Sequence, residues 1–105
     1  MGGGVSVGVW GFSNDGTGVN GKSNLGIGGV FESDKGAQIN LSPSTLLDKL
    51  PVQGQAGDLL VLNGPINPDD PGRLTGAVLY FCLTASDDSG HPAMWGRVRF
   101  DIVRD

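Results

Sequence analysis

The sequence has few of the residues on which catalysis, metal binding and disulfide bonding depend. It holds one cysteine, Cys82, and one histidine, His91, among 105 residues. A single cysteine cannot form a disulfide within the chain, and Cys82 lies in an apolar stretch where a buried, inert thiol is the usual case. His91 lacks a nucleophile motif or metal-ligand spacing, and the acidic pairs at 69–70 and 87–88 lack calcium-loop spacing. We therefore expect no enzyme activity, metal or cofactor.

Positive charge and long apolar runs are also scarce. Seven scattered Lys and Arg residues stand against eleven acidic ones, which gives a net charge of −4 and argues against a nucleic-acid-binding surface. The longest apolar run, residues 77–83, is far shorter than the ~20 residues of a membrane span. No charged-then-apolar signal segment opens the chain. We expect no nucleic acid partner and no membrane insertion, and the repeat-like start suggests a fragment of a longer protein.

Glycine, in contrast, is abundant and unevenly distributed. Twelve of the 19 glycines lie in residues 1–36, whereas all six prolines lie after them. The glycines have no three-residue period, which excludes collagen, and the interleaved valine, tryptophan and phenylalanine argue against a disordered linker. We predict two parts: a glycine-rich stalk over residues 1–37 and a small β domain over residues 38–105.

The first part contains a ten-residue repeat. Each copy is interpreted as a short extended run, Gly-Val-x-Gly-x-Ser, followed by an Asn/Asp-x-Gly turn in which asparagine and glycine accept positive φ. The copies cover residues 8–17, 18–27 and 28–37, with glycine at 8/18/28 and 16/26/36, serine at 13/23/33, and Asn14, Asn24 and Asp34 at a shared polar position.

Alternate side chains of an extended segment share a face. Val9 and Gly11 then point one way, and Trp10 and Phe12 point the other. A face of glycine has little bulk, so another backbone can approach it closely, as at a crowded axis. A glycine-rich third of a small chain buries little surface of its own, which makes another copy the obvious partner. The residues expected to pack between chains are Val9, Gly11, Val19, Gly21 and Val30.

One segment of the repeat formally matches a phosphate-binding loop. Residues 16–23 fit G-x-x-x-x-G-K-[ST], a pattern that has meaning only between a buried strand and a helix. Glycines on both sides disfavour those elements, and Lys22 occupies the repeat position of Phe12 and Glu32. The repeat alone explains the match, so nucleotide binding is a remote alternative.

The second part has the composition of an all-β domain. We predict strands at 57–64, 76–84 and 95–103, arranged as an antiparallel meander, and a further strand at 38–41. Ser44 is a candidate cap for a short helical turn through residues 45–50. The expected core consists of Leu60, Leu62, Leu79, Phe81, Leu83, Trp95, Val98, Phe100 and Ile102.

The two parts together resemble a type of bacterial and phage fibre protein. In that type, Gly-Val-x-Gly-x-Ser repeats lead into a small terminal β domain with three motifs. Here they read Gly-Asp-Leu-Leu-Val at 57–61, Leu-Tyr-Phe-Cys at 79–82 and Gly-His-Pro-Ala-Met-Trp-Gly-Arg-Val at 90–98. The resemblance implies a homotrimer in which three chains form an intertwined β-prism or β-helix stalk capped by the β domain. It also implies a virion fibre or an extracellular, cell-surface location.

Two functions follow from this interpretation. The first is a structural trimerisation module that fixes chain register and caps the stalk. The alternative is a fibre tip that binds a receptor or a surface carbohydrate, because flat aromatic faces suit sugar rings and the loop at 63–73 is longer than the resemblance leads us to expect. Its candidate ligand contacts are Trp10, Phe12, Tyr80 and Trp95.

Overall fold

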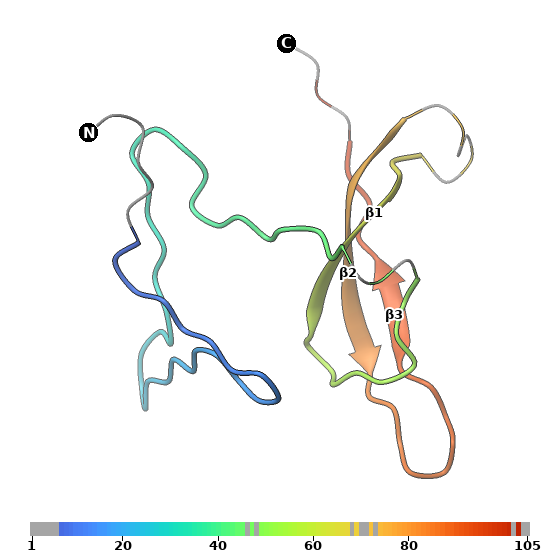
Figure 1. Cartoon of the computed structure of the whole chain (residues 1–105), viewed down its shortest axis with the longest axis horizontal. Helices are drawn as coiled ribbons and strands as arrows, with labels where there is room; N and C mark the ends of the chain where they lie inside the picture. The colour runs from blue at the N-terminus through green and yellow to red at the C-terminus, as the bar shows by residue number, and fades with distance from the viewer. Residues whose placement is uncertain are drawn as a thin grey trace. The chain divides into compact units, whose positions relative to one another are not determined.

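The chain divides into two compact units, Met1–Ile39 and Asn40–Asp105 (Figure 1). The computed structural model describes residues 7–45, 47, 49–67, 69, 72, 74–101 and 103. These residues form no helix, and their strands make a single antiparallel sheet in the second unit. The fold is therefore all-β.

The first unit repeats its conformation every ten residues. In each copy the serine hydroxyl accepts the backbone N–H of the glycine three residues later, at 2.8 Å for Ser13 and Gly16 and 2.9 Å for Ser23 and Gly26. The third copy repeats this bond between Ser33 and Gly36 at 3.0 Å. The ten-residue pattern is thus a structural period, closed at each turn by a serine side chain.

The turn glycines do not have the positive φ that the sequence predicts. Among the described residues, only Gly57 and Gly90 have φ in the left-handed region, at 95° and 89°. At Gly16 and Gly26 a different constraint operates, because an added Cβ would lie 3.2 Å from the serine Oγ. Glycine there leaves room for the hydroxyl that closes the turn.

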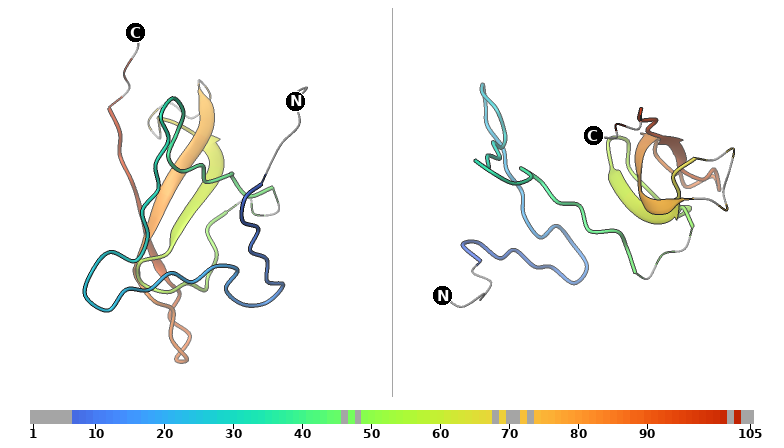
Figure 2. Two further views of the ribbon diagram at one scale, coloured as in Figure 1. Left: turned by 90° about the vertical axis from the view of Figure 1, so that its left-hand side faces the viewer. Right: turned by 90° about the horizontal axis from the view of Figure 1, so that it is seen from above.

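The second unit is built on a three-stranded meander. Strands β1 (Leu59–Pro65), β2 (Thr75–Thr84) and β3 (Met94–Arg97) lie in the order β1-β2-β3, each antiparallel to its neighbour. Two further views show β1 and β2 side by side along their length (Figure 2). β3 is shorter than the predicted 95–103, although the N–H of Val98 still donates to the carbonyl of Leu79 at 2.9 Å.

Two other predicted elements are absent from the described residues. Residues 38–41 form no strand. The N–H of Leu47 does donate to Ser44 Oγ at 3.1 Å, as a cap would require, but the described residues of 45–50 are not helical, and residues 46 and 48 lie outside the described part. Instead the N–H of Ser44 donates to the carbonyl of Val61 at 3.1 Å, so this segment lies along β1.

One face of the sheet, which we call the covered face, packs against residues 51–54. Trp95 donates its indole N–H to the carbonyl of Pro51 at 3.0 Å. Gly54 lies so close that an added Cβ would be 2.9 Å from the Trp95 ring and 3.3 Å from Cys82 Sγ. Cys82 is fully buried, as the sequence predicts, and the strand residues on this face are Leu60, Leu62, Val78, Tyr80, Cys82 and Trp95.

The opposite face, which we call the open face, corrects the predicted core. Phe81 and Leu83 are 39% and 59% exposed, because the alternation of β2 turns them away from Cys82 and Val78. Phe100 is 67% exposed beyond the end of β3, and Ile102 lies outside the described residues. The open face consists of Leu59, Val61, Asn63, Ala77, Leu79, Phe81, Leu83 and Gly96.

Candidate functional site

The most unusual feature of the first unit is its exposed apolar surface. Every large apolar side chain among its described residues is more than half exposed, from 56% at Val7 to 96% at Leu25. Water disfavours such surface, and large apolar patches on a folded chain mark interaction sites. We call the following side chains the repeat surface: Val7, Val9, Trp10, Phe12, Val19, Leu25, Ile27, Val30, Phe31 and Ile39.

The accessible area of the whole chain is correspondingly large. It is 9256 Å², whereas a compact monomer of this mass exposes roughly 5,500 Å² and two separate compact domains would expose roughly 6,600 Å². The excess, roughly 2,600 Å² over two separate domains, is larger than the ~800 Å² that each partner contributes to a standard protein interface. This chain therefore exposes more surface than a compact fold of its mass does.

The glycines of the extended runs make close contacts within their own chain. A Cβ added to Gly11 would overlap Val19 Cγ2 and lie 2.6 Å from the carbonyl oxygen of Gly18. One added to Gly21 would lie 2.7 Å from the carbonyl oxygen of Gly28. In these two copies the close backbone approach lies within one chain, whereas the sequence predicts an approach of Gly11 and Gly21 to other chains, which stays a prediction.

The third copy exchanges the positions of its large and small residues. Phe31 stands where the other copies have Gly11 and Gly21, and Gly29 stands where they have Val9 and Val19. The Phe31 ring lies 3.2 Å from a Cβ built on Gly29, so it fills the space beside that glycine. The apolar volume of the copy is thereby kept although the sequence departs from the pattern.

The candidate ligand contacts lie in both units and differ in exposure. Trp10 and Phe12 are 78% and 74% exposed on the first unit. Tyr80 and Trp95 are half-buried on the covered face, where the Trp95 indole N–H is already bonded to Pro51. The first pair is available for stacking on a ligand, whereas the second contributes to packing of the sheet.

The segment that resembles a phosphate-binding loop has no strand or helix beside it. Residues 7–45, all described, contain neither element. The N–H of Gly16, at the start of the matching pattern, donates to Ser13 Oγ at 2.8 Å. Lys22 belongs to the same irregular chain. The segment therefore lacks the strand–loop–helix context from which such a loop draws its anion-binding amides.

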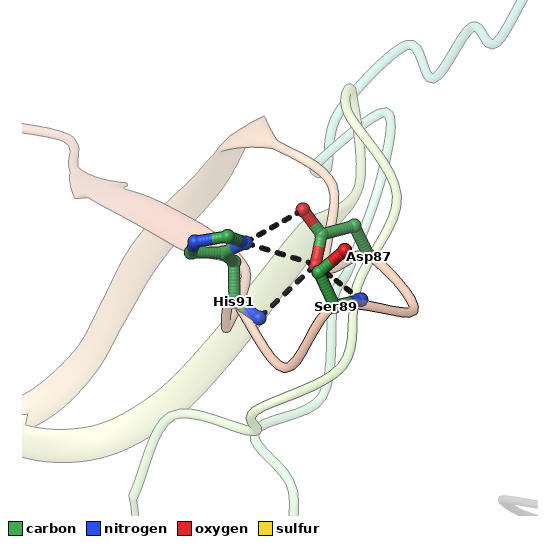
Figure 3. A network of polar contacts seen from close by, with 3 residues as sticks. All are labelled: Asp87, Ser89 and His91. Atoms are coloured by element: carbon green, nitrogen blue, oxygen red, sulfur yellow. Dashed lines mark hydrogen bonds and ion pairs between the residues drawn. The ribbon is translucent and has the colours of Figure 1, made fainter.

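A polar network in the turn between β2 and β3 is not evident from the sequence. Asp87 Oδ1 accepts the backbone N–H groups of Ser89 and His91, each at 3.0 Å, and Asp87 Oδ2 lies 2.9 Å from His91 Nδ1 (Figure 3). The backbone N–H of His91, more than the other donors, lowers the pKa of Asp87. Both side chains are at least half exposed, and Ser89 contributes its backbone N–H, so the network holds the turn between β2 and β3.

An open hollow of about 480 Å³ lies at the end of the sheet where β1 ends, beside Ile66, Ala77 and Arg97. Asn67, Arg99, Phe100 and Asp101 contribute polar and aromatic side chains to it. The one half-buried cation beside them, Arg97, donates to the carbonyl oxygens of Pro65 and Ile66. Its guanidinium therefore holds the end of β1 in place.

The described residues provide little else that could carry chemistry. They contain no group of three or more His, Cys, Asp and Glu side chains placed to hold a metal ion, and no helix among them is long and apolar enough to cross a membrane. No family model, curated protein or solved structure matches this chain, so its function has to be inferred from its own residues and contacts.

Proposed function

We propose that this chain is a structural trimerisation module of a fibre or surface protein. The observation that carries the proposal is the repeat surface, which leaves every large apolar side chain of the described first unit exposed. Association with other copies would remove from water the part of this surface that faces the neighbouring chains, including Val9, Val19 and Val30, at about 25 cal/mol per Å² of apolar area. Three chains wound together as a β-prism or β-helix would form the stalk.

The contacts within the repeat support the same assembly. In each of the first two copies, a close backbone contact at a glycine and a hydrogen bond to a serine hydroxyl hold the chain in a loop of defined shape. Fixed units of ten residues stack in regular register, as in other repeat proteins, and each then covers its neighbours. The number three comes from the resemblance to bacterial and phage fibre proteins, since an exposed apolar surface calls for partners without fixing how many.

The second unit would cap the stalk and set the register of the three chains. A repeat of period ten can slip by one whole copy at little cost, because each copy presents similar side chains. A sheet with its own core and a unique sequence removes that ambiguity. We place the assembly in a virion fibre or on an extracellular surface.

The mass of the full chain in solution tests the proposal. Sedimentation equilibrium should return roughly three times the 10.8 kDa of one chain. A mass near 11 kDa at micromolar concentration would remove the hypothesis, and a stable dimer or tetramer would overturn the number of chains.

Carbohydrate or receptor binding at a fibre tip is the second candidate function. It is favoured by Trp10 and Phe12, which stand two residues apart and keep most of their area in water. Binding on a glycan array that disappears in Trp10→Ala while the trimer mass is kept would support it. Equal loss of binding and of the trimer would assign Trp10 to assembly alone.

A further inference from the structure

We propose that the open face of the sheet is a second contact surface between copies of this chain. The inference rests on the proposed trimer and adds to it a contact outside the repeat. The open face, defined above, carries Leu59, Phe81 and Leu83, which are 56%, 39% and 59% exposed. Its occupant is the sheet of another copy.

The sequence of β2 indicates burial on both faces. An antiparallel sheet with one face in water normally alternates apolar and polar residues, whereas a strand buried on both sides is continuously apolar. Residues 77–83 of β2 form an unbroken apolar run. The covered face accounts for Val78 and Cys82, which are 4% and 0% exposed. On the open face, Leu79 is half-buried beside Val61, which is 9% exposed, whereas Ala77, Phe81 and Leu83 are exposed.

The exposed side chains form one continuous patch across the sheet. Leu59 on β1 pairs directly with Phe81 on β2, and Phe81 pairs with Gly96 on β3. Leu83 extends over Gly96, since a Cβ built there would lie 3.2 Å from Leu83 Cδ1. The patch therefore reaches all three strands, and no residue assigned to the open face is charged.

Charge and connectivity favour another copy over an unrelated partner. Each chain carries a net charge of −4, so repulsion opposes a contact between copies least at surfaces that are free of charge. The open face is such a surface. The second unit follows the repeat directly in the sequence, and joining units to one stalk raises their effective concentration to about the millimolar range. A small patch is then sufficient.

The edge of the sheet is a less suitable contact than its face. The carbonyl of Val61 on the outer edge of β1 already accepts the N–H of Ser44. At the other edge, the N–H of Ala93, just before β3, donates to the carbonyl of Val52 at 2.7 Å. Backbone groups of both edge strands are thus paired within the chain, which limits extension by an added strand.

Cross-linking of the full chain tests the contact directly. Leu59→Cys and Leu83→Cys, each treated with a short bismaleimide, should give covalently linked copies on a denaturing gel. Ser89→Cys, at an exposed position in the turn between β2 and β3 and outside the open face, should link far less. The natural Cys82 is fully buried and serves as the unreactive background.

Charge substitution provides a second measurement. Leu83→Glu should lower the melting temperature of the assembly by roughly 5–10 °C, whereas Ser89→Glu, at an exposed turn position, should change it little. A trimeric wild type that gives no linked copies at either cysteine, or that melts unchanged in Leu83→Glu, overturns the sheet contact and leaves the stalk intact. If the wild type itself is monomeric, the proposed function fails together with this contact.

Discussion

At the scale of single residues, the glycines of the repeat have three different roles. Gly16 makes room for a serine hydroxyl, and Gly21 makes room for the carbonyl of Gly28. Gly8, in contrast, has no neighbour within 4 Å of an added Cβ. The same residue type in one repeat is therefore under different constraints, and substitutions can separate them.

Alanine substitution should distinguish the crowded glycines from the open one. Gly21→Ala places a Cβ 2.7 Å from the carbonyl oxygen of Gly28, and overpacking of this kind costs about 1–3 kcal/mol. Gly8→Ala meets nothing and should be neutral or stabilise by about 0.4–1 kcal/mol, because it reduces the freedom of the unfolded chain. Thermal melting of the assembly measures both. Equal destabilisation by the two variants would instead place the constraint between chains.

The serine that closes each turn can be tested separately. Ser23→Ala removes the Oγ that accepts the N–H of Gly26 at 2.9 Å. A lost hydrogen bond of about 1 kcal/mol should speed hydrogen exchange of the Gly26 amide about fivefold. Ser23→Thr keeps an acceptor oxygen and is the matched control. Unchanged protection in Ser23→Ala would show that the turn is held by other contacts.

At the scale of elements, β1 and β2 are predictable from sequence and the third strand only in part. Apolar runs bounded by glycine locate β1 and β2 to within two residues at each end. β3 ends at Arg97, whose side chain turns to the carbonyls of Pro65 and Ile66, a tertiary contact that alternation alone cannot show. The core prediction fails at Phe81 and Leu83, because apolar identity does not say which face of a sheet has a cover.

The turn between β2 and β3 should respond to acid through Asp87. Backbone N–H groups of His91 and Ser89 lower the pKa of this carboxyl from its ordinary value of 3.8. Its folded pKa is thus below the unfolded one, so its contribution to stability is complete above about pH 3.8 and is lost as the pH falls through the folded pKa. A carboxyl NMR titration should place the Asp87 midpoint below 3.8.

A pair of variants controls the acid response. Asp87→Asn should abolish the loss of stability that protonation of Asp87 causes at low pH. It should also loosen the turn, which would be measured as faster hydrogen exchange of the His91 amide. Asp88→Asn removes the neighbouring carboxylate without removing the acceptor that His91 uses. If both variants alter amide exchange equally, net charge and not the specific hydrogen bonds determines the response.

At the scale of the whole molecule, the described contacts leave much apolar surface unpaired. The ten-residue period and the positions of its turns could be predicted from the spacing of glycine and serine, but not the serine hydroxyl that closes each turn in place of a positive φ. The contacts between Gly11 and Gly18 could not, because close approach within one chain and between chains demands the same small residue. The exposed fractions separate contacts within the chain from candidate contacts between chains. The close contact of Gly11 with Gly18 is already made within the chain, whereas the side chains of the repeat surface remain exposed.

The two faces of the repeat give the most direct test of how chains associate. Val9 is 86% exposed and Trp10 is 78% exposed. In an isolated chain, an aspartate at either position would therefore change the free energy of unfolding little. In the proposed stalk Val9 lies toward the other chains and Trp10 away from them. Val9→Asp should therefore shift the sedimentation mass toward one chain, since an unpaired charge buried at an interface costs several kcal/mol. Trp10→Asp should keep the trimer, and the opposite pattern would reverse which face is inside.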